Sequence, residues 1–91
     1  MNKTLIDQIG NTPIVKSLAL NTNPNVSLYF KLEGNNPGGS VKDRAAYNMI
    51  KSALDSKRID ANSKLIEATS GYTGIALAMI CSVFKLNIEL V

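Results

Sequence analysis

Lys42 is the residue whose position most strongly suggests chemistry, because it follows a glycine-rich segment at the expected start of a helix. Residues 34–39 read Gly-Asn-Asn-Pro-Gly-Gly, a composition that excludes a helix interior or a central strand. Ser40 is a favourable N-cap and Asp43 stands at the capping-box position, which predicts that a helix begins here. The helix dipole disfavours a cation in the first turn and so favours a neutral, nucleophilic amine on Lys42. The alternative is an ordinary solvated lysine.

A second segment of small residues, Thr-Ser-Gly-Tyr-Thr-Gly at 69–74, also lies between an expected strand and an expected helix. Loops that follow parallel strands meet at the carboxyl edge of a sheet, where ligands bind. Glycine lets backbone N–H groups approach a ligand, and each helix start adds free donors and a positive dipole end. The two loops together predict an anion-binding crevice. Plain turn chemistry is the alternative for each loop alone.

Nucleotide-binding motifs fail on spacing. Residues 34–39 match the G-x-x-x-x-G start of a phosphate-binding loop, but lysine and serine or threonine do not follow directly. No G-x-G-x-x-G sequence occurs, so a dinucleotide fingerprint is absent as well.

The two residues after Lys42 are expected either to pair with each other or to face water (Asp43 and Arg44).

The order of the predicted elements indicates an α/β fold with a parallel sheet. A helical turn is expected at 4–9 and a short strand at 14–16, followed by period-two alternation at 26–32 that predicts a longer strand. A helix at 41–56, a strand at 64–68, a helix at 75–85 and a strand at 87–91 follow. This order predicts βαβ units in a three-layer arrangement.

The helix expected at 75–85 is apolar on nearly all sides, which is typical of a helix buried within a layer. Cys81 on this helix is therefore expected in the core and not as a nucleophile. Two helices cover such a sheet poorly, so we interpret the chain as the N-terminal part of a larger α/β protein. A small complete domain that oligomerises to cover its sheet is the alternative.

The composition narrows the function classes. The 91 residues are 45% hydrophobic and 19% charged, as in a folded domain. The net charge of +3 is spread along the chain and aromatic residues make up 5%, which argues against a nucleic-acid reader. No apolar run approaches the roughly 20 residues of a membrane span. With one cysteine and no histidine, a His- or Cys-based metal site is not expected, and the location is expected to be cytoplasmic.

Three segments carry a resemblance to one enzyme family. Residues 9–13 (Ile-Gly-Asn-Thr-Pro), 31–44 (Lys-Leu-Glu-Gly-Asn-Asn-Pro-Gly-Gly-Ser-Val-Lys-Asp-Arg) and 67–78 (Glu-Ala-Thr-Ser-Gly-Tyr-Thr-Gly-Ile-Ala-Leu-Ala) resemble consecutive signatures of cysteine synthase. This is O-acetylserine sulfhydrylase, of the fold-type II pyridoxal-phosphate family, and the wording of the middle segment is closest to the B isozyme. The resemblance implies an N-terminal segment, 1–33, that packs on a later domain. It implies that 34–91 form part of a βαβ small domain.

The resemblance also implies roles for individual residues. Lys42 matches the lysine that binds pyridoxal 5'-phosphate through its amine and takes the α-proton of the substrate. The second loop matches the one that receives the carboxylate of the amino-acid substrate (Thr69, Ser70, Gly71 and Thr73). The implied reaction replaces the acetate of O-acetylserine with sulfide to make L-cysteine. Related enzymes that use other sulfur donors and leaving groups share these motifs.

Tyr72 departs from the family, which has an asparagine that hydrogen-bonds the ring hydroxyl of the cofactor at this position. A phenol donates or accepts but is longer and stiffer, so Tyr72 is expected to bind or crowd the cofactor ring, to stack nearby, or to face solvent. The family's phosphate-binding loop lies in a later part of its longer chain. We therefore expect the isolated 91 residues to be inactive. The resemblance also implies that the full-length enzyme is a homodimer. A non-catalytic relative that acts as an interaction module or survives as a remnant is the alternative.

Overall fold

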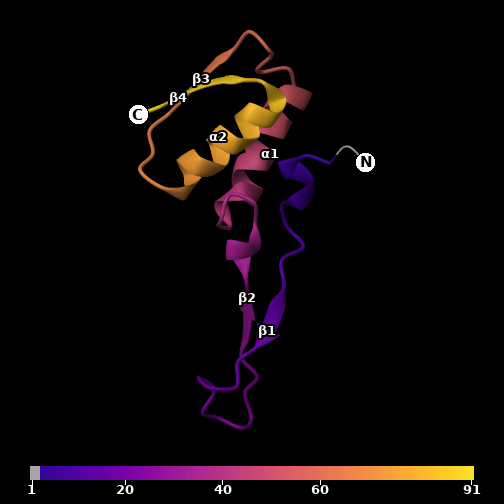
Figure 1. Ribbon diagram of the computed structural model, residues 1–91, viewed down its shortest axis with the longest axis vertical. Coiled ribbons are helices and arrows are strands. Elements are labelled where there is room, and N and C mark those ends of the chain that lie inside the picture. Colours follow the sequence, from indigo (N-terminus) through magenta and orange to yellow (C-terminus); the bar gives the residue numbers. More distant parts are fainter. Residues whose placement is uncertain (1–2) are drawn as a thin grey trace.

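A helical body and a narrow two-stranded arm make up the structure, a computed structural model that describes residues 3–91 (Figure 1). The described chain extends over 56 × 35 × 20 Å because the arm projects from one end of the body. The body contains α1 (Lys42–Asp55), β3 (Lys64–Glu67), α2 (Tyr72–Phe84) and β4 (Asn87–Leu90). The arm contains β1 (Ile14–Lys16) and β2 (Tyr29–Lys31). The short 3₁₀ helices η1 (Leu5–Gln8) and η2 (Glu33–Asn35) lie at the junction of the two.

The unit β3–α2–β4 is a parallel βαβ unit, which confirms the α/β class. Leu65 stands opposite Ile88 in the register, and both pack against the helices. Lys64 and Glu89 lie on the opposite face, where their side chains form an ion pair at 3.1 Å. Ile66 on that same face is 64% exposed. The helices therefore cover one face of this two-stranded sheet.

Packing of α1 against α2 forms the core. The buried apolar side chains come from these two helices and from the short connection between α2 and β4: Ala46, Ile50, Ala76, Leu77, Ile80, Cys81 and Leu86. Burying a side chain of the size of isoleucine or leucine contributes about 1.5–3 kcal/mol. The predicted core position of Cys81 is confirmed, and burial raises the pKa of its thiol.

The N-terminal turn is also confirmed and packs on this core. Thr4 and Asp7 form a reciprocal capping box around η1. Ile6 and Ile9 are half-buried against the core cluster. Part of the predicted segment 1–33 thus contacts the helices of this chain, while residues 1 and 2 lie outside the described residues.

The predicted strand at 26–32 is wrong in length and in partner. Only β2 forms, and it pairs antiparallel with β1, with Val15 opposite Phe30. Bonds from Ser17 N to Leu28 O and from Leu32 N to Pro13 O, both 2.8 Å, extend the pairing beyond the strands. Within residues 3–91, β2 has β1 as its strand partner and is not part of the sheet of β3 and β4. Within residues 3–91 each sheet has two strands, and the predicted three-layer sheet is not formed by these residues.

The predicted start of the second helix is three residues late. α2 begins at Tyr72, because the hydroxyl oxygen of Thr69 accepts the amide of Gly74 at 3.2 Å and satisfies a donor of the first turn. Its end agrees with the prediction within a residue, and Lys85 closes it in the left-handed region at φ 58°. The prediction relied on apolar periodicity, and residues 72–74 (Tyr-Thr-Gly) do not continue that pattern, so the first turn was not predicted.

Candidate active site

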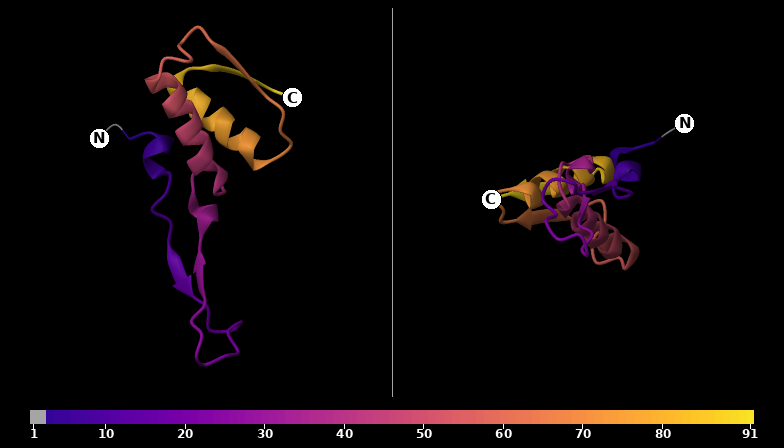
Figure 2. Two further views of the ribbon diagram at one scale, coloured as in Figure 1. Left: turned by 180° about the vertical axis from the view of Figure 1, so that it is seen from behind. Right: turned by 90° about the horizontal axis from the view of Figure 1, so that it is seen from below.

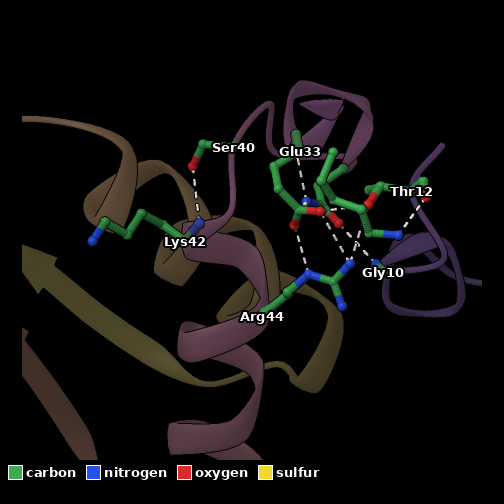
Figure 3. Close-up of polar contacts among 8 residues, drawn as sticks. Gly10, Thr12, Glu33, Ser40, Lys42 and Arg44 are labelled. Atoms are coloured by element: carbon green, nitrogen blue, oxygen red, sulfur yellow. Dashed lines mark hydrogen bonds and ion pairs between the residues drawn. The ribbon is translucent and has the colours of Figure 1, made fainter. Parts of the chain in front are cut away.

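Lys42 is the first residue of α1, and its side chain is exposed. Its amide donates to Ser40 Oγ at 3.1 Å, so Ser40 holds the main chain of the first turn. The backbone N-cap is Val41, one residue later than predicted. In Figure 3 the side chain of Lys42 extends away from the polar cluster around Glu33 and Arg44. The amine is therefore available to a ligand.

Asp43 does not complete a capping box, contrary to the prediction. It is fully buried, and its Oδ2 accepts the amide of Gly38 at 2.5 Å. Its Oδ1 is buried and has no hydrogen-bond partner within residues 3–91. A Cβ on Gly38 would stand 2.2 Å from this Oδ1, which no real contact allows. Glycine at 38 is thus required for the loop to close over Asp43.

Arg44 pairs with Glu33, and the expectation that it pairs with Asp43 or simply faces water is wrong. Its Nε donates to Glu33 Oε1 at 2.6 Å, and its Nη2 donates to Glu33 Oε2 and to Thr12 Oγ1, each at 3.2 Å (Figure 3). The hydroxyl of Thr12 in turn donates to Glu33 Oε2. Hydrogen bonds from Arg44 and then from Thr12 lower the pKa of Glu33 to about 2. The same carboxylate raises the pKa of Arg44.

Asn36 extends this cluster to the N-terminal turn. Its Nδ2 donates to the main-chain oxygen of Glu33 at 2.8 Å and to Glu33 Oε1 at 3.1 Å. Its Oδ1 accepts the amide of Gly10 at 2.8 Å. Asn36 is 4% exposed. Sequence reasoning missed Thr12, Glu33 and Asn36 as site residues, although all three lie within the segments that carry the family resemblance.

The second loop is organised around Thr69. Besides the amide of Gly74, its Oγ1 accepts the amide of Gly71 at 3.4 Å. Ser70 and Gly71 are exposed, and no atom lies within 4 Å of the position that a Cβ on Gly71 would take. Thr73, which is half-buried, follows in the first turn of α2, where amides have no intrahelical acceptor. The loop is therefore open around Gly71, directly before the first turn of α2.

The side chain of Tyr72 lies close to the first loop. A Cβ on Gly39, which has φ +92°, would stand 3.7 Å from Cε1 of Tyr72. The ring of Tyr72 thus lies beside the loop that leads to Lys42, and the residue remains 56% exposed. Within the described chain no hydrogen bond joins Lys42 to residues 69–73. The loops are adjacent without being locked to each other.

Residues 5–91 match the family described as "Pyridoxal-phosphate dependent enzyme". The chain belongs to this family. Its members depend on pyridoxal 5'-phosphate, which confirms the predicted cofactor at the level of the family. Similar proteins and solved structures agree with the predicted α/β fold and with the resemblance to cysteine synthase.

Curated relatives carry the name cysteine synthase B. The protein from Salmonella typhimurium is 56% identical over 79 residues, which are 87% of this chain and 26% of the relative. The protein from Escherichia coli is 54% identical over 79 residues, with the same coverage. The chain thus spans about a quarter of the length of these relatives.

Solved structures share the fold over the whole chain. A hydrogen sulfide-producing enzyme from Fusobacterium nucleatum is 49% identical with a TM-score of 0.91, covering 99% of this chain and 30% of that one. O-acetylserine sulfhydrylase isoform 3 from Entamoeba histolytica is 35% identical with a TM-score of 0.92, covering 100% of this chain and 28% of that one.

The donor set fits part of a pyridoxal-phosphate site. Lys42 offers an exposed primary amine, the kind of group that forms a covalent bond with an aldehyde. The phenol of Tyr72 and the open loop at Gly71 lie at the start of the neighbouring helix, α2.

Within residues 3–91 no group of three or more metal-ligating side chains is found, and no helix has the length and apolar character needed to cross a bilayer.

Proposed function

We propose that this chain is the lysine-bearing portion of a pyridoxal-phosphate-dependent cysteine synthase that makes L-cysteine from O-acetylserine and sulfide. The observation that carries the proposal is the exposed amine of Lys42, at the start of a helix beside a second open loop, in a chain of this family. Because the chain spans about a quarter of its relatives, the proposed activity is that of the whole protein. The isolated 91 residues are proposed to be inactive.

The cofactor, Lys42 and the second loop would have separate roles in the reaction. Pyridoxal phosphate, when bound, withdraws electrons from the α-carbon of the amino acid. Lys42 Nζ would hold the cofactor covalently before the substrate binds, and once the substrate amine has displaced it, the freed amine would be the base for the α-proton. Thr69, Ser70, Gly71 and Thr73 receive the substrate carboxylate, an assignment supported by the open space at Gly71 and by the amides of the first turn of α2.

Tyr72 is proposed to hydrogen-bond the cofactor ring through its phenol. Its ring already lies beside Gly39 in the loop before Lys42, so it borders both halves of the site. A tyrosine side chain is longer than that of an asparagine, so its phenol would donate to a group that lies further from the main chain of α2.

The remaining parts of the proposal concern the longer protein. Residues 1–33 pack on a later domain, and further strands complete a three-layer sheet around the small domain begun by 34–91. The protein is a cytoplasmic homodimer that acts on a small amino-acid substrate and contacts neither nucleic acid nor membrane. The uncovered face of β3, with Ile66 64% exposed, supports the need for further layers.

A non-catalytic interaction module is the second candidate, favoured by the apolar surface of the arm. Leu18 is 86% exposed, Leu20 70% and Ile14 63%, and β1 and β2 have no buried side chain. Such a surface is typical of one that contacts another chain or domain. In this reading Tyr72 marks the loss of the cofactor site.

Titration with pyridoxal phosphate separates the two candidates. The purified chain is followed by visible absorbance, the covalent adducts are fixed with borohydride, and the modified lysines are mapped by peptide mass. The proposed function predicts preferential modification of Lys42 over Lys57 and Lys51, and a loss of the absorbance band in Lys42→Ala. Modification spread evenly over the lysines would favour the interaction module.

A further inference from the structure

We infer that Glu33 and Arg44 are positioning residues which, together with Asp43, clamp the main chain of the turn that carries Lys42. The inference deepens the proposed function and rests on the role of Lys42 proposed above. These residues would act by holding the main chain around Lys42 and need not touch the cofactor. The clamp is defined by Glu33, Asp43 and Arg44.

The outer half of the clamp is the bond set of Arg44. Its guanidinium donates three hydrogen bonds, two to Glu33 and one to Thr12. The Glu33 side chain is 21% exposed and the Arg44 side chain 41%, so the pair is partly shielded from water. Through Thr12 and Glu33 the arginine joins the first turn of α1 to a loop 32 residues earlier and to η2. A planar guanidinium donates in several fixed directions at once, which a lysine in its place could not do.

The inner half of the clamp is the carboxylate of Asp43. It is fully buried and accepts the amide of Gly38 at 2.5 Å. Asp43 therefore holds the loop before Lys42, and Arg44 holds the turn after it. Lys42 itself is attached through its amide to Ser40 at 3.1 Å.

The consequence is a fixed main chain with a free side chain. The main-chain neighbours of Lys42 are anchored on two sides, whereas its amine extends away from the cluster (Figure 3). A lysine side chain has many rotamers, so a mobile backbone beneath it would spread the amine over a still larger volume. Holding the main chain in advance raises the fraction of time that the amine spends in a productive position.

The other ion pairs within residues 3–91 connect only neighbouring segments, so we assign the positioning role to the pair of Glu33 and Arg44. Lys51 and Asp55 pair within α1 at 3.0 Å, with side chains 50% and 65% exposed. Lys64 and Glu89 join two neighbouring strands, with side chains 56% and 55% exposed. Exposed pairs of this kind contribute little to a structure. The pair of Lys51 and Asp55 therefore provides a matched control on the same helix.

Amide hydrogen exchange tests the clamp without any cofactor. The reporter is the amide of Gly10, whose acceptor, Asn36 Oδ1, is held in place by Glu33. In Arg44→Gln we expect this amide to exchange about five-fold faster, as for the loss of one hydrogen bond of typical net strength. In Asp55→Asn it should not change. An unchanged rate in Arg44→Gln would overturn the inference.

Borohydride trapping with pyridoxal phosphate tests the effect on the amine. The measured quantity is the ratio of adduct at Lys42 to adduct at Lys57, which normalises for the amount of reagent. Arg44→Gln should lower this ratio about ten-fold. Without the clamp, the backbone of about one residue must be ordered when the cofactor binds, and the entropic cost of that ordering lowers the affinity by about this factor. Arg44→Lys keeps the charge opposite Glu33 but not the bond to Thr12, and should fall between. Asp55→Asn should match the wild type.

The two measurements separate this inference from the proposed function. A wild type that shows no preference for Lys42, with Gly10 exchange still accelerated in Arg44→Gln, would support the clamp and contradict the proposed function. A wild type that prefers Lys42, with the same ratio in Arg44→Gln, would overturn the inference and leave the proposed function standing. If Arg44→Gln loses its helical circular dichroism, Glu33→Gln, which keeps the side-chain size, takes its place in both measurements.

Discussion

Replacing Gly38 with alanine tests how tightly the loop before Lys42 closes over a buried carboxylate. The added Cβ would stand 2.2 Å from Asp43 Oδ1 and 2.9 Å from both Cγ and Oδ2. Asp43 is fully buried on α1 and has no exposed direction in which to retreat. Gly38 does not have a left-handed φ, so backbone strain adds nothing and the steric contact acts alone.

The magnitude follows from the bond that must break. The amide of Gly38 donates to Asp43 Oδ2 at 2.5 Å, and Oδ1 already has no partner within the described chain. A hydrogen bond to a charged group contributes about 1.5–3 kcal/mol, and leaving the buried partner unsatisfied adds to the loss. We therefore expect the free energy of unfolding to fall by about 2–4 kcal/mol. For a chain of this size that corresponds to a drop in Tm of about 10–25 °C.

Urea unfolding of Gly38→Ala beside Gly34→Ala provides the assay and its control. A Cβ on Gly34 would meet only the main-chain oxygen of Gly39, at 3.9 Å, which is an ordinary contact. Gly34→Ala should therefore change the free energy of unfolding by no more than about 0.5 kcal/mol. In a double-mutant cycle, Asp43→Ala combined with Gly38→Ala should cost less than the sum of the two, because both remove the same interaction. Equal effects at Gly34 and Gly38 would refute the closure of the loop over Asp43.

Three further predictions follow from the structure. The pKa of Glu33 is lowered from 4.5 to about 2, so its contribution to stability is fully present above pH 4.5 and is lost as the pH falls towards 2; urea midpoints of wild type and Glu33→Gln should converge over that range, and a constant difference would contradict it. A Cβ on Gly74 would stand 2.6 Å from Cγ2 of Thr69, so Gly74→Ala should lower the free energy of unfolding by about 1–3 kcal/mol. Thr69→Ser removes that methyl, and the double variant should be at least as stable as Thr69→Ser alone; continued destabilisation would disprove the steric cause. Tyr72→Asn should strengthen pyridoxal-phosphate binding in an absorbance titration and Tyr72→Phe should weaken it, whereas equal effects would exclude a role for the phenol.

Local patterns in the sequence were sufficient to predict α1, β1, β3 and β4 and the end of α2. The predicted helix at 41–56 agrees with α1 within one residue at each end, and the strand at 14–16 agrees with β1. Strands at 64–68 and 87–91 agree with β3 and β4 within one residue. These elements are specified by apolar periodicity and turn residues over a few neighbouring positions.

Long-range pairing was not predictable in the same way. The alternation at 26–32 correctly indicated extended chain but carried no information about the partner of β2, which is a strand that precedes it. Arg44 pairs with Glu33, 11 residues away, and bonds to Thr12, 32 residues away. Polar contacts over such separations leave no periodicity in a single sequence. Asp43 was misassigned for the opposite reason, because its position matched a local capping pattern that a buried contact with Gly38 overrode.

The approach of the two loops has a different physical cause from the one that the sequence suggested. We expected both loops at the carboxyl edge of one parallel sheet, yet the first loop follows β2, which lies in another sheet. The loops meet because α1 and α2 pack side by side with their first residues, Lys42 and Tyr72, at the same end (Figures 1 and 2). Ala46 of α1 and Ala76 of α2 are both fully buried in the core that the two helices share, and their small side chains permit a close approach. The geometry of the proposed site therefore depends on small side chains in the core as much as on the loops that would contact a ligand.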